Sequence, residues 1–498
     1  MISCNVSKYT KSPEPVNANL EHANLEHANL DPMIARGPAQ SDGHPVSRVT
    51  DRHIRLLLLS SESEVLVAED LNRRNFLKTA ALAAGPALMT ARGANDKINI
   101  GWIGVGTRGY AALDWLHTAA PNDVRITAIC DTYQGYLARA LDRMQTVWGN
   151  KPATYDDYHQ LLADKSIDAV YIMTPEHLHH DMTIAALRAG KHVYIEKPLA
   201  HTIEEGFDIV NEWNKSGKIV QVGTQNRSSS LYKKAKELVQ QGMIGDVHYV
   251  RAFWYRNGLP NEPSWRYAIP PDANPHNTDW ERFLGTAPQR DWDPHRYFQW
   301  RLYWDYSGGI STDLLVHQTD IVNFMLDKTV PRSCMASGGI YRWTDKTDDR
   351  DVPDCLTAVY DYSDKFQINY SCYLGNEYFG YGEELCGNEG TIRIMNRQDL
   401  YFEAETYNSR RPGAPDRAPA SIQARQPIHL NGRADFNESD GAINHFRNFI
   451  QAILGNEKVI APPPVGQQAA ISGHMATLSY KNQKKIVWDD SSNQYHFA

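Results

Sequence analysis

The chain has 498 residues, 42% of them hydrophobic and 22% charged, which is the composition of a globular protein of two or three domains. Its formal net charge of −8 gives no reason to expect nucleic acid or an anionic membrane as a partner. The six cysteines include no C-x-x-C pair and have the scattered spacing of small core residues, not that of a metal knot or a disulfide framework. A disulfide among Cys334, Cys355, Cys372 and Cys386 stays open if the protein is exported.

Residues 1–70 do not have the pattern of a folded domain. The unit Ala-Asn-Leu-Glu-His recurs over residues 18–27, among proline and polar residues, and no apolar periodicity continues long enough to build a core. Two interpretations are open. The segment is a disordered extension, or translation begins nearer Val65 or Val67.

Residues 71–94 carry the features of a twin-arginine export signal in the expected order. Arg73 and Arg74 precede Phe-Leu-Lys, a short apolar run over residues 79–89 and small residues up to Ala94. The run is too short to span a bilayer. The alternative is a surface helix with a chance Arg-Arg pair, but the order of the features favours export to a bacterial periplasm.

The stretch from Lys97 to Asp131 reads as strand, glycine turn, helix, strand and acid. Gly104, Gly106 and Gly109 form a G-x-G-x-x-G turn, which allows a tight bend, backbone approach to a pyrophosphate and close packing of helix on strand. The helix N-terminus then offers unpaired N–H groups to the phosphates. Asp131 would accept hydrogen bonds from the ribose hydroxyls and would repel a 2′-phosphate, so NAD is favoured over NADP. A dinucleotide site is favoured over the alternative, a plain βα turn that binds no ligand.

Strands and helices alternate over residues 95–223. The expected strands are Lys97–Ile103, Val124–Cys130, Ala169–Met173, His192–Ile195 and Ile219–Val222. The expected helices between them include Tyr158–Ala163, Met182–Ala189 and Ile203–Ser216. This alternation predicts a doubly wound parallel α/β sheet of the Rossmann type.

Residues 224–498 are expected to form a second α/β domain. A helix over Leu231–Gln241 leads into aromatic-rich strands at His248–Tyr255, Cys334–Trp343, Cys355–Tyr362, Phe366–Tyr373, Gly390–Met395 and Leu400–Glu405. Successive strands of this kind predict a large, mostly antiparallel sheet. Residues 279–304 and 410–425 are expected to be loops, and residues 441–454 and 469–481 helices.

Polar segments follow three of the first-domain strands, at the sheet edge where open α/β proteins bind ligands. They are Thr174-Pro175, Glu196-Lys197-Pro198 and the segment from Gly223 to Arg227. Lys197 precedes a proline, which keeps it extended, and it could donate to a substrate hydroxyl with a pKa lowered by burial. The alternative for Lys197 is a solvated surface lysine.

His177, His179 and His180 form a cluster that could suggest a metal site. Only Glu176 and Asp181 accompany it at ligand spacing, so a helix start with partly exposed histidines is favoured and no metal is expected.

In the second domain, Gly308-Gly309 precedes a predicted helix that carries Asp313 and His317. At a spacing of i and i+4 the two side chains share a face, and the carboxylate would raise the pKa of the imidazole and orient it as a general base. An ordinary Asp–His pair on a helix surface is the alternative.

The glycine turn, Thr174-Pro175-x-x-x-His179, Glu196-Lys197-Pro198 and Asp313-x-x-x-His317 together resemble the Gfo/Idh/MocA oxidoreductase family, over Lys97 to about Lys484. The resemblance implies a Rossmann domain followed by an α/β domain whose open sheet faces substrate. That sheet would also support a homo-oligomer, a dimer or a tetramer.

The resemblance also implies roles for individual residues. Binding of NAD would fall to Gly104, Gly106, Arg108, Gly109, Asp131, Thr174, Pro175, His179, Glu196, Lys197 and Gln225. Lys197, Asp313 and His317 would be catalytic, with His317 taking a hydroxyl proton, Asp313 orienting it and Lys197 stabilising the alkoxide while hydride passes to the nicotinamide. Arg227, Trp300 and Arg301 are weaker candidates for sugar contacts, and Trp300 could instead be core.

Export and a dinucleotide site together have a consequence, because the bacterial envelope has no ready pool of soluble NAD. The hypothesis is a tightly held cofactor and redox-neutral turnover of a sugar, polyol or glycoside. An NAD-dependent glycosidase, which oxidises, eliminates, hydrates and reduces back, is the second interpretation. A non-catalytic sugar-binding protein is the third.

Overall fold

A computed structural model describes residues 97–498, apart from residues 260–261, 345–347 and 407–418. All of these residues belong to one unit, Asp70–Ala498. The predictions for residues 1–70 and 71–94, the export signal among them, lie outside the described residues, as does most of the expected loop 410–425.

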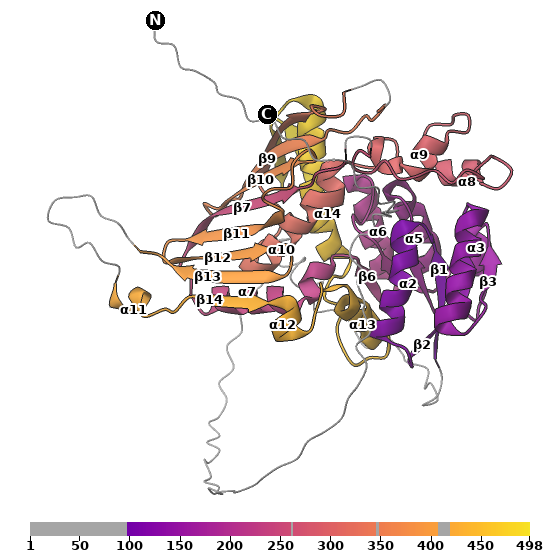
Figure 1. The fold of residues 1–498 in the computed structure, drawn as a ribbon, viewed down its shortest axis with the longest axis horizontal. Helices are drawn as coiled ribbons and strands as arrows, with labels where there is room; N and C mark the ends of the chain where they lie inside the picture. The colour runs from indigo at the N-terminus through magenta and orange to yellow at the C-terminus, as the bar shows by residue number, and fades with distance from the viewer. Residues whose placement is uncertain (1–96, 260–261, 345–347, 407–418) are drawn as a thin grey trace, which may run out of the picture. The chain divides into compact units, whose positions relative to one another are not determined.

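The first sheet has six parallel strands in the order β3-β2-β1-β4-β5-β6 (Figure 1). The strands are β1 (Ile98–Ile103), β2 (Val124–Cys130), β3 (Ala153–Tyr155), β4 (Ala169–Ile172), β5 (His192–Ile195) and β6 (Val220–Val222). The order reverses between β1 and β4, which makes a switch point beside the glycine turn. The five predicted strands are confirmed. The edge strand β3 is three residues long and has no apolar run, so the sequence did not indicate it.

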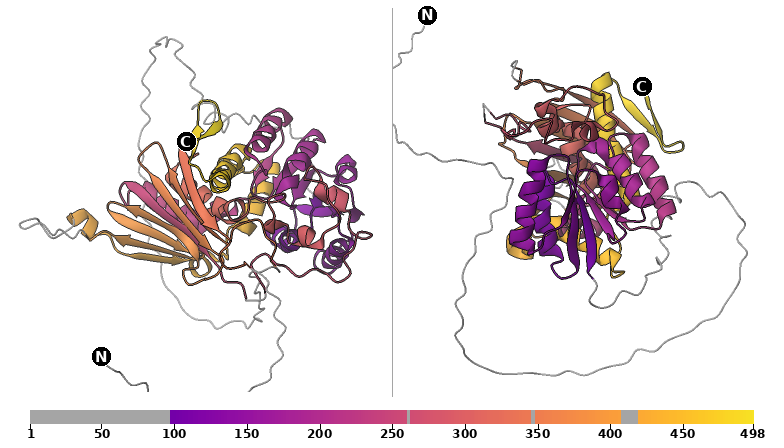
Figure 2. Two further views of the ribbon diagram at one scale, coloured as in Figure 1. Left: turned by 90° about the horizontal axis from the view of Figure 1, so that it is seen from above. Right: turned by 90° about the vertical axis from the view of Figure 1, so that its right-hand side faces the viewer.

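Helices cover both faces of this sheet (Figure 2). They are α2 (Thr107–Ala119), α3 (Gln134–Arg143), the π-helix η1 (Met144–Trp148), α4 (Tyr158–Ala163), the 3-10 helix η2 (Glu176–Leu178), α5 (His179–Arg188) and α6 (Ile203–Ser216). Alternate strand residues pack on opposite sides: Trp102 and Tyr171 join the core on the α2 side, and Val170 the core on the α5 side.

Two late helices, α13 (Ala442–Ile453) and α14 (Pro463–Asn482), return to the first sheet. Phe446 and Phe449 of α13 pack on Tyr194 of β5, with ring centroids 4.8 and 5.8 Å away. Ala470 of α14 lies in the core on the other face. The division expected at residue 223 therefore describes the sheets, but not the helices that cover them.

The second sheet has ten strands in the order β14-β13-β12-β11-β7-β10-β9-β8-β15-β16. They are β7 (Val247–Tyr255), β8 (Ser333–Gly339), β9 (Cys355–Asp361), β10 (Gln367–Tyr373), β11 (Tyr381–Gly387), β12 (Gly390–Met395), β13 (Asp399–Ala404), β14 (Ile428–Asn431), β15 (Ile486–Asp489) and β16 (Gln494–Phe497). Its pairs are antiparallel except β7 with β10, so the prediction of a mostly antiparallel sheet is confirmed. The sequence did not indicate β11, β14, β15 or β16. The glycines and glutamates of β11 disfavour a strand, which forms by pairing with β7 and β12.

The remaining helices are short, apart from α7 and α10. They are η3 (Gln225–Ser228), α7 (Ser230–Gln240), α8 (Trp280–Leu284), α9 (Pro294–Phe298), η4 (Trp300–Leu302), the π-helix η5 (Ser311–Leu315), α10 (Val316–Leu326), α11 (Ala420–Gln423) and α12 (Gly432–Phe436). The expectation of a loop over residues 279–304 is wrong, because Asp279 and Asp293 cap α8 and α9 there.

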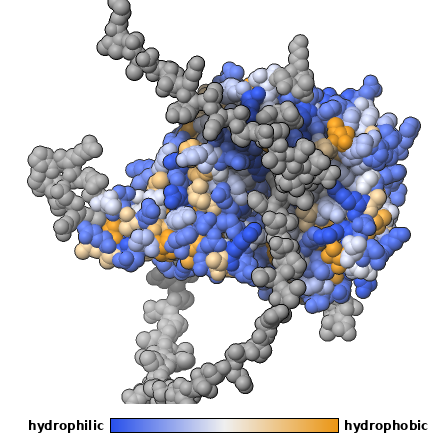
Figure 3. All heavy atoms as spheres, viewed as in Figure 1, coloured by the Kyte–Doolittle hydropathy of each residue, from blue (hydrophilic) through white to orange (hydrophobic). Residues whose placement is uncertain are grey.

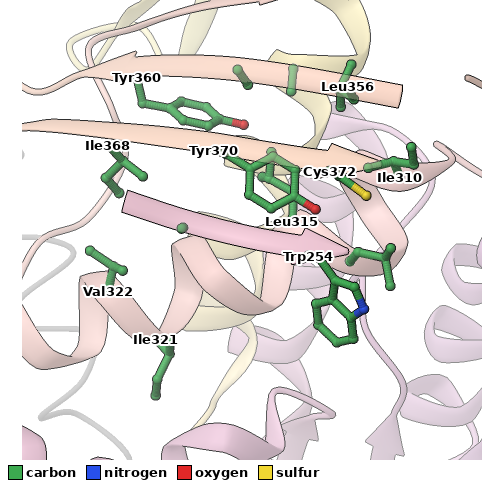
Figure 4. Packing of buried hydrophobic residues seen from close by; sticks show 14 of the residues in the cluster. Trp254, Ile310, Leu315, Ile321, Val322, Leu356, Tyr360, Ile368, Tyr370 and Cys372 are labelled. Atoms are coloured by element: carbon green, nitrogen blue, oxygen red, sulfur yellow. The ribbon is translucent and has the colours of Figure 1, made fainter. Parts of the chain in front are cut away.

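One face of the large sheet is buried and the other is open. Ile368, Tyr370 and Cys372 alternate along β10 and pack toward α10 (Figure 4). On the open face, Tyr249 is 38% and Met335 46% exposed. Hydrophobic side chains lie among hydrophilic ones over the strands of this sheet (Figure 3).

The cysteines of the described chain, Cys130, Cys334, Cys355, Cys372 and Cys386, are all free thiols, so the disulfide left open from the sequence is not formed. None of the helices in the described ranges has the length and apolarity needed to cross a bilayer.

Candidate functional site

The glycine turn lies between β1 and the N-terminus of α2. Gly104 has φ +90°, and a Cβ there would lie 2.8 Å from the carbonyl oxygen of Met173. A Cβ at Gly109 would lie 2.0 Å from the carbonyl oxygen of Gly104. At Gly106 the nearest atom would be a ring carbon of Tyr136, at 3.5 Å. Packing therefore requires glycine at 104 and 109, whereas Gly106 keeps free the space that a pyrophosphate needs at the helix N-terminus.

Asp131 follows β2 and closes the turn from the other side. Its Oδ2 accepts from the backbone N–H of Val105 at 2.7 Å, and its Oδ1 accepts from the N–H of Tyr133 and the hydroxyl of Tyr297. Burial raises the pKa of Asp131, and the two backbone hydrogen bonds oppose that shift. Oδ2 keeps a lone pair for a ribose hydroxyl, so the position fits the role expected for Asp131.

Arg108, inside the glycine turn, pairs with Glu196 at the carboxyl end of β5. Its Nε and Nη2 each lie 3.0 Å from Oε1 of Glu196, and its guanidinium lies 4.5 Å from the ring centre of Trp115. The pair joins the turn after β1 to the segment that carries Lys197. Both residues therefore border the space beside Gly106.

His179 connects two other strand ends. Its Nδ1 lies 2.8 Å from the carbonyl oxygen of Pro198 and its Nε2 lies 3.0 Å from that of Thr174. The ring therefore holds the Thr174-Pro175 turn against the Lys197-Pro198 turn, whose peptide bond is cis. His179 therefore positions the Thr174-Pro175 turn through its contacts with backbone oxygens.

The expectation of partly exposed histidines is wrong for two of the three. His177 and His179 are buried, 5% and 1% exposed, and only His180 is half-buried. Burial lowers the pKa of His177 to about 3, and its Nε2 lies 2.7 Å from the carbonyl oxygen of Phe283. Within the described residues, no group of three His, Cys, Asp or Glu side chains could hold a metal ion.

Lys197 and Asp313 meet across the two sheets, although 116 residues separate them in the chain. The ammonium of Lys197 donates to Oδ1 and to the backbone oxygen of Asp313, both at 2.8 Å. The Nε of Arg301 donates to the same Oδ1 at 3.2 Å. Burial opposes ionisation of Asp313, but Lys197 and Arg301 hold the pKa of its carboxyl well below the usual range. Lys197 keeps one N–H donor for a further acceptor.

His317 differs from the prediction, which paired it with Asp313 and raised its pKa. Burial, together with the positive charges of Arg397 and Lys197, lowers the pKa of His317 well below its usual value. Asp313 lies in the π-helix η5, and its negative charge still favours protonation of His317, but burial and the two positive charges outweigh it. The carboxylate of Asp313 bonds to Lys197 and Arg301 instead, and His317 is a neutral base at neutral pH.

Glu176 attaches the first-domain site to the start of η5. Its carboxylate is buried and accepts from the hydroxyls of Ser307 and Thr312 and from the N–H of Gly308. Burial raises the pKa of Glu176 to about 7. The sequence offered Glu176 only as a weak metal ligand, whereas it positions the helix that carries Asp313.

Several buried polar atoms around these residues lack a hydrogen-bond partner in the described part of the chain. They are Thr224 Oγ1, Gln225 Oε1, both amide atoms of Asn226, His317 Nδ1 and both amide atoms of Gln318. The first group follows β6 and the second lies on α10, and η3 and α10 are in contact. Buried polar groups are rarely left unpaired unless a ligand or water completes them, so this is where a polar ligand fits.

The predicted substrate-contact residues divide into two kinds. Arg227 is buried in an ion pair with Asp320, with Nε within 2.9 Å of both carboxylate oxygens, so its guanidinium supports the fold beside η3. Trp300 is half-buried with the guanidinium of Arg301 4.3 Å from its ring centre. Trp300 and Arg301 therefore lie beside Asp313, and Arg227 serves packing.

The sequence did not single out Asn226, Trp254, Gln318 or Arg397. Asn226 and Gln318 are next to predicted residues, and position alone could have indicated them. Trp254 and Arg397 lie on a strand and in a strand turn, and nothing in their local sequence points to the site.

A parallel sheet with a glycine turn at its switch point, and with a lysine and a histidine from separate segments nearby, defines the class of two-domain dinucleotide-dependent oxidoreductases. Two family models match the chain: an oxidoreductase family, NAD-binding Rossmann fold, over residues 98–224, and an oxidoreductase family, C-terminal alpha/beta domain, over residues 281–487. The chain belongs to the Gfo/Idh/MocA oxidoreductase family and has its NAD-binding domain.

Curated relatives are similar over part of the chain. An inositol 2-dehydrogenase/D-chiro-inositol 3-dehydrogenase of Lactiplantibacillus plantarum is 31% identical over 163 residues, 32% of this chain and 45% of that protein. A glycosyl hydrolase family 109 protein of Shewanella baltica is 31% identical over 208 residues, 36% of this chain and 44% of that protein. The matched region thus spans less than half the length of these relatives.

Solved structures share the fold. A levoglucosan dehydrogenase in complex with NADH and levoglucosan has a TM-score of 0.59 and 19% identity, covering 78% of this chain and 99% of that one. An NAD-binding oxidoreductase from Klebsiella pneumoniae has a TM-score of 0.59 and 21% identity, covering 79% and 100%.

Proposed function

We propose that the protein transfers hydride between NAD and a hydroxyl-bearing carbon of a sugar, polyol or glycoside. The observation that carries the proposal is the convergence of Lys197, Asp313 and His317 beside unpaired polar atoms at the switch point. An ammonium, a neutral imidazole and several amide groups suit a substrate rich in hydroxyls. Relatives named for inositol and levoglucosan point to the same substrate class.

The Gly104–Gly109 turn, Asp131, the Arg108–Glu196 pair and Gln225 would hold NAD, which supplies the hydride acceptor. Gly106 fits that role because the protein itself does not need glycine there. Thr174, Pro175 and His179 line up the neighbouring strand ends.

The chain's own residues handle the proton. His317 is neutral, and its Nδ1 has no partner in the described ranges, so it can accept the hydroxyl proton as hydride leaves the carbon. The remaining N–H of Lys197 donates to the oxygen as negative charge develops. Asp313 holds Lys197 in place, and its negative charge favours the imidazolium that His317 becomes.

The test is incubation of the purified protein with a panel of sugars, polyols and glycosides while bound-NADH absorbance and products are followed together. Absorbance that rises with a substrate, and is lost in Lys197→Ala and His317→Ala, supports the proposal. Hydride transfer that survives both substitutions overturns it.

The glycoside-hydrolase relatives favour a second candidate, hydrolysis through transient oxidation. In that case a new reducing end forms and no NADH accumulates. The known family of that kind lacks the usual Glu-Lys-Pro lysine, and this chain has Lys197, so oxidoreduction is preferred.

Export through the twin-arginine route remains a prediction. It would require NAD to be bound before export and turnover to be redox-neutral. Stoichiometric NAD in protein purified without added cofactor supports tight binding, and an empty, exchanging site contradicts it.

Assembly through the open face of the ten-stranded sheet, as a dimer or a tetramer, is also a proposal. The exposed Tyr249 and Met335 on that face support it. Light scattering of the purified protein measures the oligomer size.

A further inference from the structure

Arg397 lies in the turn between β12 and β13, with φ +59°. Its guanidinium carbon lies 5.0 Å from the ring centre of Trp254 and 5.6 Å from that of Tyr381. These two rings stack on each other with centroids 4.5 Å apart. Trp254 and Tyr381 are paired residues of β7 and β11; Trp254 belongs to the core on the buried face of the sheet, and Tyr381 packs against that core. Arg397 therefore lies on this buried face.

The Nε and Nη2 atoms of Arg397 are buried, and neither has a hydrogen-bond partner in the described part of the chain. A guanidinium always carries its charge, and its planar fork matches a carboxylate or a phosphate. Leaving two charged donors buried without an acceptor is unfavourable. The position therefore calls for an anion.

Two buried carboxylates, Asp313 of the site and Glu383 of β11, do not supply that anion. Asp313 is bonded to Lys197 and Arg301. Glu383 is buried, accepts from the hydroxyl of Tyr232, and burial raises its pKa to about 7. Neither carboxylate bonds to Arg397 among the hydrogen bonds of the described residues.

Arg397 faces the same space as His317. The ring of Trp254 lies 6.1 Å from that of His317, and the guanidinium carbon of Arg397 lies 5.0 Å from the same ring. The charge of Arg397 also contributes to the lowered pKa of His317. A ligand whose hydroxyl meets His317 can thus present another group to Arg397.

We propose that the substrate is an anionic sugar, with a carboxylate or a phosphate that the guanidinium of Arg397 binds while His317 meets a ring hydroxyl. This inference rests on the proposed function and narrows its substrate class. Arg397 is then a specificity-determining residue, because a neutral sugar leaves its two donors unpaired.

The experiment compares binding and turnover of three probes by the NAD-loaded protein: glucuronate, glucose 6-phosphate and glucose. Calorimetry gives the affinities, and bound-NADH absorbance gives kcat and KM. We expect at least one anionic probe to bind on the order of 100-fold more tightly than glucose, because charge-assisted hydrogen bonds are worth about twice neutral ones. The anionic probe that binds more tightly shows whether the group that meets Arg397 is a carboxylate or a phosphate.

Three variants separate this effect from general damage. Arg397→Gln should lower the affinity for the anionic probe far more than the affinity for glucose, whereas Arg397→Lys should keep part of the preference. Arg393→Gln is the matched control, because Arg393 lies on β12 between the buried Ile392 and Ile394 and stacks on Tyr401 on the opposite face. It should leave the preference unchanged.

Equal affinity for all three probes, or a preference that survives in Arg397→Gln, overturns the inference. If glucose is oxidised with the same kcat/KM as the anionic probes, the proposed function stands and the anionic substrate class is wrong. If an anion binds through Arg397 but no probe is oxidised, the site assignment stands and the reaction fails.

Discussion

The cofactor half and the proposed catalytic half of the site are built in different ways. The glycine turn and Asp131 both lie within residues 104–131, and their positions follow from one strand, one turn and one helix. Lys197, Arg397 and the helical segment that carries Asp313 and His317 are three separate parts of the chain, and they meet only through packing and buried charge. Local geometry thus prepares the cofactor half, whereas the catalytic half depends on long-range contacts.

The strongest test of this difference is Lys197→Ala. It removes the donor aimed at the substrate oxygen and also leaves Asp313 with Arg301 as its charged partner, so we expect kcat to fall about 1,000-fold. Bound NAD, measured by absorbance of the purified protein, should fall far less than kcat, because Lys197 is one of many residues expected to contact the cofactor. Lys215→Ala, an exposed lysine on α6, serves as the control and should be neutral. Equal losses of cofactor and rate would contradict the separation of the two halves.

The next test stays within the cofactor half. Gly109→Ala forces a Cβ to 2.0 Å from a backbone oxygen, so we expect it to lower the free energy of unfolding by about 1–3 kcal/mol or more. Gly106→Ala meets only a ring carbon at 3.5 Å, so the fold should be unchanged while NAD affinity falls roughly tenfold or more.

Denaturant unfolding and NAD titration of both variants separate the two glycines. If Gly106→Ala lowers the free energy of unfolding, or leaves the affinity for NAD unchanged, the space beside Gly106 does not hold the cofactor.

Glu176 tests how the halves are joined. Its folded pKa of about 7 lies above the value of 4.5 for a free glutamate, so the folded protein binds more protons than the unfolded chain between these values. This group's contribution to stability is therefore present below pH 4.5 and is lost as the pH rises to about 7. The free energy of unfolding of the wild type should therefore fall relative to that of Glu176→Gln as the pH rises across this window. If the difference in free energy of unfolding between the two proteins stays constant from pH 4.5 to 7, the raised pKa of Glu176 does not contribute to the pH dependence of stability.

The smallest expected effect is that of Trp300→Ala. Stacking of Arg301 on a half-buried Trp300 is worth about 0.5–1 kcal/mol, so KM should rise only a few-fold while kcat stays nearly constant. Trp292→Ala, another half-buried tryptophan of this segment, is the comparison. A large fall in kcat in Trp300→Ala would mean that Trp300 orients Asp313 through Arg301.

The architecture was largely predictable. Alternating strand and helix patterns indicated the parallel sheet, and aromatic strands indicated the second sheet, because period and apolar runs are properties of neighbouring residues. β11 was not predictable, since its glycines and glutamates become a strand only between β7 and β12. The short helices α8 and α9 were hidden by proline and tryptophan in a segment that reads as a loop.

By itself, the sequence determined the glycine turn, the acid after β2 and the identities of the lysine and the histidine, because backbone conformation and turn chemistry act over a few residues. Tertiary structure alone decided which charges those residues meet. Asp313 bonds to Lys197 and Arg301, which the local sequence did not indicate as its partners. Burial lowers the pKa of His317, and the turn after β12 places Arg397 against Trp254, where its charge lowers that pKa further. Desolvation and charge depend on every neighbour in space, and those neighbours come from parts of the chain that no local pattern connects.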